Sequence, residues 1–175
     1  KLINIASGEL VSANILSIEK GEKGKPGEIK GTIENSYTIG KVYKNTAFGV
    51  YGTLENKQIL NVSENDAVEV ASREEIKTGK AEILCELENG KKQKYEIEIE
   101  RIFINNNSDN KSMLIKITDT ELIEKTGGII QGMSGAPILQ NGKLIGAVTH
   151  VLVNDPTEGY AVFGDILVEQ MSSVD

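Results

Sequence analysis

The chain has 175 residues, of which 39% are hydrophobic, and this is enough for one sizeable core or for two small β-barrels that share an interface. The formal net charge of -7 and the pI near 4.9 argue against nucleic acid or anionic lipid as a partner, because the electrostatic term has the wrong sign, and fit a neutral or basic protein or peptide substrate better. Aromatic residues are only 5% and Trp is absent, so the core must come from Ile, Val, Leu and Ala, which favours strands.

The chain begins at Lys1 without an initiator Met, a signal-peptide pattern or an apolar run long enough to span a membrane, so we expect a processed or truncated product whose targeting segment lies upstream. Turn signals then recur at short intervals and predict many short strands. The clearest hairpin joins residues 81–87 to residues 94–104, because Asn89-Gly90 supplies the positive φ of a type I′ turn. Its alternation predicts one buried face, which includes the single cysteine: Ile83, Cys85, Leu87, Tyr95, Ile97 and Ile99.

The second half of the chain carries the helical signals and a second hairpin. A capping-box pattern at residues 118–121, with Gly127-Gly128 behind it, predicts a short helix over residues 119–126. Residues 137–139 and 144–148 form a hairpin that turns at Asn141-Gly142 and is apolar on both faces, as strands at the centre of a molecule are. Residues 165–171 are a second helix candidate. We therefore predict a mainly β fold with one or two short helices.

The run GGIIQGMSGAPI at residues 127–138 has the form of a serine nucleophile loop. A nucleophilic serine presents its Oγ outward while nearby backbone N–H groups converge on the oxyanion, and glycines allow the sharp bends that this needs. Ser134 is the candidate nucleophile, and the amides of Gly132 and Ser134 are the candidate oxyanion hole. Gly-X-Ser-Gly-X-Pro, with Pro137 opening an apolar hairpin, is typical of chymotrypsin-like peptidases. Gly, Ser and Pro also build ordinary turns, so the motif by itself is suggestive.

The base that such a serine needs is not evident in the chain. The only histidine, His150, ends the strand that returns from the Asn141-Gly142 turn, where chymotrypsin-like sheets place the floor of the substrate pocket. We predict a pocket role for His150 together with Val148, Thr149 and Tyr160, suited to a modest uncharged side chain, and expect the base before Lys1. One Cys and one His, far apart in sequence, do not make a metal site, and no cofactor is predicted.

These segments resemble the stage IV sporulation protein B serine peptidases of endospore-forming Firmicutes, peptidase family S55. The resemblance rests on residues 127–138, on NGKLIGAVTHVLVNDPTEGY at residues 141–160 and on GEKGKPGEIKG at residues 21–31. It implies that Ser134 is the nucleophile, that Asp119 is the acidic triad member, and that the catalytic histidine lies in a Gly-His-Gly-like segment a few residues before Lys1. Asp119 also suits a helix N-terminus, and Asp155 and Asp165 are the alternatives.

The resemblance implies a chymotrypsin-like double β-barrel, which we expect as one peptidase domain over residues 1–175 with subdomains at about 1–105 and 106–175. It also implies an upstream PDZ domain and membrane anchor, and a location between the mother-cell and forespore membranes. The implied function is a signalling endopeptidase that cleaves itself and a membrane-bound regulatory protein, and so triggers intramembrane processing of a sporulation sigma factor.

Two other functions compete with this interpretation. A non-catalytic peptidase-fold module that binds peptides or a partner protein explains the missing base, but it has no chemical reason to keep Ser134 and both glycines. An α/β-type acyl hydrolase fits less well, because its Gly-X-Ser-X-Gly elbow joins a strand to a helix, whereas Pro137 here opens a strand.

Overall fold

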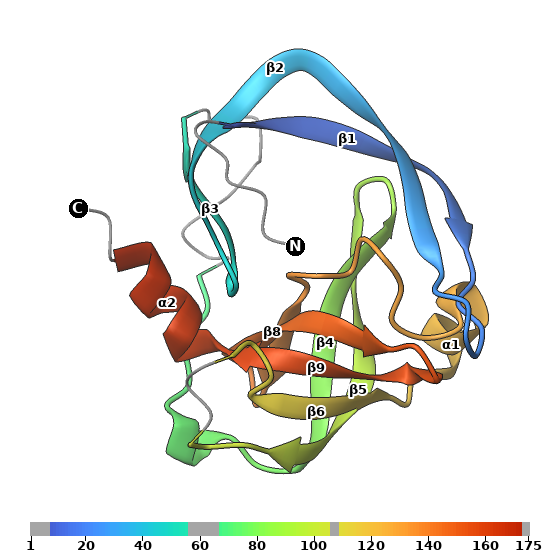
Figure 1. The fold of residues 1–175 in the computed structure, drawn as a ribbon, viewed down its shortest axis with the longest axis vertical. Helices are drawn as coiled ribbons and strands as arrows, with labels where there is room; N and C mark the ends of the chain where they lie inside the picture. Colours follow the sequence, from blue (N-terminus) through green and yellow to red (C-terminus); the bar gives the residue numbers. More distant parts are fainter. Residues whose placement is uncertain (1–7, 56–66, 106–108, 173–175) are drawn as a thin grey trace.

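The computed structural model describes residues 8–55, 67–105 and 109–172. Three antiparallel strands form an open sheet in the order β1-β2-β3: β1 is Gly8–Glu19, β2 Glu28–Thr46 and β3 Gly49–Leu54. Six further strands close into an antiparallel barrel in the order β4-β5-β6-β9-β8-β7. Figure 1 shows the β1–β3 sheet arching over the barrel.

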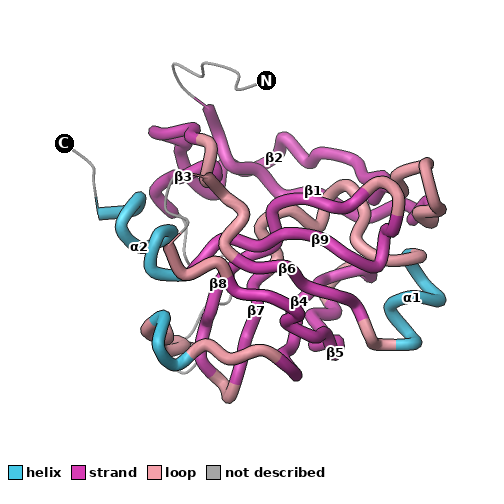
Figure 2. The backbone as a smooth tube through the Cα atoms, turned by 60° about the horizontal axis from the view of Figure 1, so that its bottom comes forward, coloured by secondary structure: helices cyan, strands magenta, loops and turns pink. Residues whose placement is uncertain are grey.

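The barrel strands follow one another along the second half of the chain, with two short helices between and after them. The strands are β4 (Gly79–Glu88), β5 (Lys91–Ile102), β6 (Met113–Ile117), β7 (Pro137–Gln140), β8 (Lys143–Leu152) and β9 (Asp155–Phe163). Helix α1 (Thr120–Thr126) follows β6, helix α2 (Gly164–Ser172) follows β9, and a 3-10 turn, η3 (Arg73–Glu75), precedes β4. Figures 1 and 2 place α1 and α2 at opposite sides of the barrel. No helix among the described residues is long and apolar enough to cross a membrane.

The barrel interior is the hydrophobic core. The alternating face predicted for β4 and β5 is buried throughout, from 0% exposure at Ile83, Ile97 and Ile99 to 7% at Cys85. Strands β6, β7, β8 and β9 contribute Ile115, Ile138, Val148 and other aliphatic side chains, and Phe163 fills the end next to α2. The mainly β prediction is confirmed, and aliphatic residues supply nearly all of the core.

The predicted subdomain boundary near residue 105 is wrong. Strands β4 and β5 belong to the barrel, because β5 pairs with β6 and β4 pairs with β7, so the change from one sheet to the other falls between Leu54 and Gly79. Within the described residues the first unit is a three-stranded sheet and only the second is a closed barrel. The pairing of β4 with β5 is local and visible in the sequence. The pairing of β4 with β7 joins residues more than 50 positions apart, so the sequence did not show that β4 and β5 belong to the barrel.

The two predicted hairpins differ in how they turn. At the β7–β8 turn both Asn141 (φ 52°) and Gly142 (φ 79°) take the left-handed conformation, as a type I′ turn requires. At the β4–β5 turn only Gly90 does (φ 76°), so the type I′ prediction is wrong there. The Asn89 side chain is used elsewhere: its Oδ1 accepts from the Ile15 N–H at 2.7 Å and its Nδ2 donates to the Ile15 carbonyl at 3.1 Å. Asn89 thereby fastens the barrel to β1.

Candidate active site

The loop between α1 and β7 carries the candidate nucleophile. Gly127, with φ 73°, ends α1 in the left-handed conformation, and its N–H donates to the Ile123 carbonyl at 2.8 Å. Gly132 (φ 101°) and Gly135 (φ 89°) then flank Met133 and Ser134, at backbone angles that strain any other residue. The buried Met133 side chain anchors the turn, and the adjacent Ser134 is exposed. The two glycines therefore allow sharp bends on both sides of Met133 and Ser134, and the Ser134 side chain faces outward.

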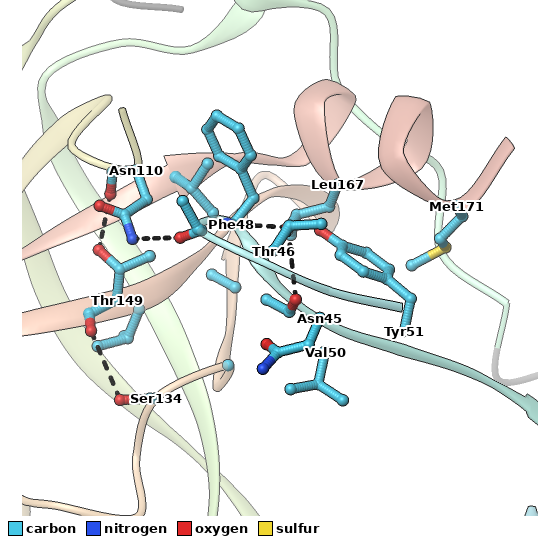
Figure 3. Close-up of a pocket in the computed structure, with 16 residues that line it drawn as sticks. Asn45, Thr46, Phe48, Val50, Tyr51, Asn110, Ser134, Thr149, Leu167 and Met171 are labelled. Atoms are coloured by element: carbon cyan, nitrogen blue, oxygen red, sulfur yellow. Dashed lines mark hydrogen bonds between the residues drawn. The ribbon is translucent and has the colours of Figure 1, made fainter. Parts of the chain in front are cut away.

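Strand β8 holds this loop against the barrel. The Gly135 N–H donates to the Val148 carbonyl at 2.8 Å, and the Val148 N–H donates to the Ala136 carbonyl at 3.1 Å. The Ser134 hydroxyl lies over the next residue of β8 and donates a long hydrogen bond of 3.5 Å to the Thr149 carbonyl (Figure 3). A contact of this length restrains the hydroxyl weakly and leaves it available to another acceptor.

The predicted oxyanion hole consists of the backbone N–H groups of Gly132 and Ser134. Among the described residues, neither the Gly132 amide nor the Ser134 amide donates a hydrogen bond, while the neighbouring amides of Met133, Gly135 and Ala136 all do. An oxyanion hole needs donors that are available in this way, and the role of these two amides stays a prediction.

A cavity of about 520 Å³ adjoins Ser134 on the side of the first sheet. The turn between β2 and β3, strand β8 and helix α2 supply most of its wall, which includes Asn45, Thr46, Phe48, Tyr51, Val148, Thr149, Leu167 and Met171. Hydrogen bonds tie these parts together: the Asn110 side chain donates to the Ala47 carbonyl at 2.6 Å, and the Thr149 hydroxyl donates to the Asn110 carbonyl at 2.7 Å (Figure 3). The cavity therefore spans the junction of sheet and barrel.

Comparison with known proteins shows the family to which this chain belongs. A family model described as SpoIVB peptidase S55 matches residues 1–171. The chain belongs to this family. The family is one of serine peptidases, which hydrolyse peptide bonds. No curated protein matches the chain.

Solved structures of the Rv3671c protease from M. tuberculosis share the fold of this peptidase. The active form is 13% identical, with a TM-score of 0.55 over 85% of this chain and 63% of its own length. An inactive form is 13% identical, with a TM-score of 0.55 over 97% of this chain and 88% of its own. A serine-to-alanine variant in the inactive form is 11% identical, with a TM-score of 0.54 over 97% and 86%. At these identities the likeness concerns the fold alone, which is that of chymotrypsin-like proteases.

The structure brings some of the predicted site residues of the peptidase together. Ser134, Val148 and Thr149 line one cavity, whereas Gly132 lines another one with Ile29 and Met133. His150 and Tyr160 are paired across β8 and β9 but are not among the residues that line this cavity. The His150 side chain is exposed, and the Ser134 hydroxyl bonds to Thr149 and not to it. The pocket roles of His150 and Tyr160 stay predictions.

Asp119 does not line the cavity beside Ser134. It is the N-cap of α1: its Oδ1 accepts from the Leu122 N–H at 3.0 Å, and its Oδ2 accepts from the Glu96 N–H of β5 at 3.2 Å. It lines a cavity with Gln140 and the Asn141-Gly142 turn, and this cavity shares no lining residue with the one beside Ser134. The carboxylate thus joins α1 to the barrel, and its role as triad acid stays a prediction.

The two alternative acids have structural partners as well. Asp155 accepts from the Thr157 N–H at 3.0 Å and from the Thr157 hydroxyl at 2.6 Å, and these two hydrogen bonds lower the pKa of Asp155. Asp165, at the start of α2, pairs with Arg73 at 2.6 Å. Neither lines the cavity beside Ser134. Among the described residues, no cluster of three or more His, Cys, Asp or Glu side chains is arranged to hold a metal ion.

Sequence reasoning missed the contribution of the β2–β3 turn to the site. Nothing local in residues 45–51 signals proximity to Ser134, because the contact arises only when sheet and barrel pack together. Tyr51 is the most informative of these residues: it is only 6% exposed, and its hydroxyl is the one buried side-chain polar atom without a hydrogen-bond partner in the described part of the chain. Burial raises the pKa of Tyr51.

Proposed function

We propose that this chain is the catalytic core of a sporulation-signalling endopeptidase whose nucleophile is Ser134. One observation carries the proposal: an exposed serine hydroxyl stands between two glycines with positive φ, beside two backbone amides that donate to nothing else among the described residues. An ordinary turn has no requirement for unpaired donors beside a serine. Acyl transfer requires both features together.

The chemistry follows from this arrangement. The Ser134 Oγ attacks the carbonyl carbon of the scissile peptide, a base takes the hydroxyl proton, and the amides of Gly132 and Ser134 hold the oxyanion that forms. The carbonyl reforms as the C–N bond breaks, and the base returns its proton to the leaving amine. Water then attacks the acyl-enzyme through the same tetrahedral geometry and releases Ser134 and the carboxylic acid product.

In the part of the chain that the structure describes, no side-chain base bonds to the Ser134 hydroxyl. The Thr149 carbonyl accepts the Ser134 hydroxyl but is far too weak a base to remove its proton, and His150 makes no bond to it. We place the base in the segment before Lys1, where the resemblance implies a histidine, with its imidazole entering the cavity beside Ser134. The cavity has room for it, and the Ser134 hydroxyl forms one rim.

The biological role rests on the family. SpoIVB peptidases are associated with sporulation, and we propose that this member acts outside the cytoplasm, between the mother-cell and forespore membranes, and cleaves a membrane-bound regulatory protein. Cleavage of that protein would trigger intramembrane processing of a sporulation sigma factor. We further propose that the enzyme cleaves itself, and that its membrane anchor and PDZ domain precede Lys1.

Self-cleavage offers a direct test of this proposal. The protein is extended at its N-terminus through the predicted histidine, incubated, and followed by intact-mass spectrometry beside its Ser134→Ala variant. We expect a fragment whose mass defines a cut in the wild-type protein and no such fragment in the variant. A fragment that forms equally in both would point to a contaminating protease, and a stable wild-type protein would contradict self-cleavage.

A further inference from the structure

The turn that joins β1 to β2 contacts the end of α1, where the nucleophile loop begins, and the residue that follows β8. The Gly21 N–H donates to the Thr126 carbonyl at 2.8 Å, at the end of α1, and the Gly24 N–H donates to the Val153 carbonyl at 2.8 Å, after β8. Figure 1 shows this turn reaching down from the first sheet to α1. The segment that begins the nucleophile loop is therefore bound between this turn and the barrel.

The start of β2 pairs directly with the residue that precedes the oxyanion hole. Gln131 forms an isolated parallel bridge with Glu28: the Gln131 N–H donates to the Gly27 carbonyl at 2.9 Å, and the Ile29 N–H donates to the Gln131 carbonyl at 2.9 Å. The Gln131 carbonyl and the Gly132 N–H belong to one planar peptide unit, in which the two groups point in opposite directions. The hydrogen bond from Ile29 therefore fixes the direction in which the Gly132 N–H points.

Backbone and side-chain atoms are closely packed where the β1–β2 turn meets the nucleophile loop. A Cβ on Gly27 would lie 2.4 Å from the Glu19 carbonyl oxygen, 2.4 Å from the Gly21 nitrogen and 2.7 Å from the Ile130 side chain. Beneath Gly132 lies the Ile29 side chain, which a Cβ on Gly132 would meet at 3.1 Å. Gly27 is required for close approach and not for its backbone angle, because its φ is not among the positive values.

We propose that Gly27 and Ile29 are positioning residues of the peptidase, which hold the Gln131–Gly132 peptide so that the Gly132 amide faces the oxyanion. This inference rests on the proposed function of Ser134 and Gly132. Rotation of that one peptide plane removes one of the two donors without displacing Ser134. The first sheet donates no hydrogen bond to the oxyanion, but it controls the stabilisation of the transition state through this peptide.

The test compares Gly27→Ala with Gly31→Ala in the protein extended through the predicted histidine. Both substitutions place a Cβ against a carbonyl oxygen of β1, that of Glu19 for Gly27 and that of Asn14, at 2.8 Å, for Gly31, but only Gly27 adjoins the nucleophile loop. With a peptide substrate we expect Gly27→Ala to lower kcat about 100-fold with KM within about twofold, because an oxyanion-hole donor acts only in the transition state. We expect Gly31→Ala to keep kcat within about twofold.

A second pair of substitutions, which are milder, keeps the proposal testable if Gly27→Ala does not fold. Ile29 and Ile18 face each other across β1 and β2 and are both half-buried, but Ile29 is the one that packs under Gly132. We expect Ile29→Ala to lower kcat about tenfold and Ile18→Ala to leave it within about twofold. Equal effects on kcat within either pair would overturn the proposal.

Amide hydrogen exchange separates failure of this inference from failure of the proposed function. It is measured on the present chain and needs no catalysis. We expect the Gln131 amide to exchange at least tenfold faster in Gly27→Ala than in Gly31→Ala, because its acceptor is the Gly27 carbonyl. Equal exchange rates would refute the positioning role even if the peptidase is active. Faster exchange in Gly27→Ala, together with an extended protein that no serine reagent labels, would uphold the contact and refute the role of Ser134.

Discussion

Substitution of Asp119 separates a structural carboxylate from a catalytic one. In the structure both oxygens of Asp119 accept backbone N–H groups, one from Leu122 within α1 and one from Glu96 on β5. Alanine removes both bonds. Loss of the N-cap costs about 1 kcal/mol, and loss of the second hydrogen bond about 1 kcal/mol more. For a chain of this size we expect a total of about 2 kcal/mol to lower Tm by about 4–8 °C.

Asparagine gives the decisive variant, because Asp119→Asn keeps one acceptor oxygen for the Leu122 N–H. Asn is as good an N-cap as Asp, so only the bond from Glu96 is lost, and we expect a destabilisation of about 1 kcal/mol. A triad acid responds differently: Asn in its place fixes the wrong imidazole tautomer and lowers kcat about 10⁴-fold in a folded enzyme.

The assay is thermal unfolding together with the rate of fluorophosphonate labelling, in the protein extended through the predicted histidine. Both hydrogen bonds are lost in Asp119→Ala, so we expect it to be the less stable of the two. If Asp119 is the triad acid, as the resemblance implies, Asp119→Asn will fold but label slower than wild type by orders of magnitude. Labelling of Asp119→Asn within about threefold of wild type would refute the triad role and leave Asp119 with the structural role alone.

Three other groups give predictions that do not need an active enzyme. Tyr51→Phe removes a buried hydroxyl with no partner among the described residues, so we expect unchanged or higher stability in urea unfolding; a clear loss would show that the hydroxyl binds a group in the cavity. Hydrogen bonds from Lys143 and from the Ser72 N–H lower the pKa of Glu75 to about 2, below its ordinary value of 4.5. The folded state then binds fewer protons, so this contribution is present above about pH 4.5 and is lost as pH falls toward 2. The stability gap between wild type and Glu75→Gln should close over that interval, and a gap independent of pH would contradict the assignment. Burial raises the pKa of Cys85 to about 12, so a thiol reagent at pH 8 should modify it only upon unfolding; rapid modification of the native chain would contradict its burial.

Local pattern was sufficient to predict the elements of the barrel. Alternation in residues 81–104 predicted the buried face of β4 and β5, Asn141-Gly142 predicted the β7–β8 turn, and the glycines after residue 126 predicted where α1 ends. Each of these features depends on residues close together in sequence, where strand period, turn angle and helix capping are decided.

The errors arose where distant segments meet. The boundary near residue 105 failed because the pairing of β4 with β7 is invisible in either strand alone. At Asn89, where the type I′ prediction is wrong, the side chain bonds to Ile15, 74 residues away. The residues around Ser134 that come from the β2–β3 turn carry no local signal, since sheet packing against the barrel brings them there. Motif and family gave the nucleophile loop, but only tertiary structure reveals what surrounds it.

The central claim is that Ser134 is the nucleophile of a serine peptidase. Fluorophosphonate labelling tests it most directly, in the protein extended through the predicted histidine and in its Ser134→Ala variant, with adduct position read by peptide mass spectrometry. We predict one adduct, on Ser134, in the extended protein and none in the variant. An adduct that persists in Ser134→Ala, or a folded extended protein that the reagent does not label, would contradict the claim.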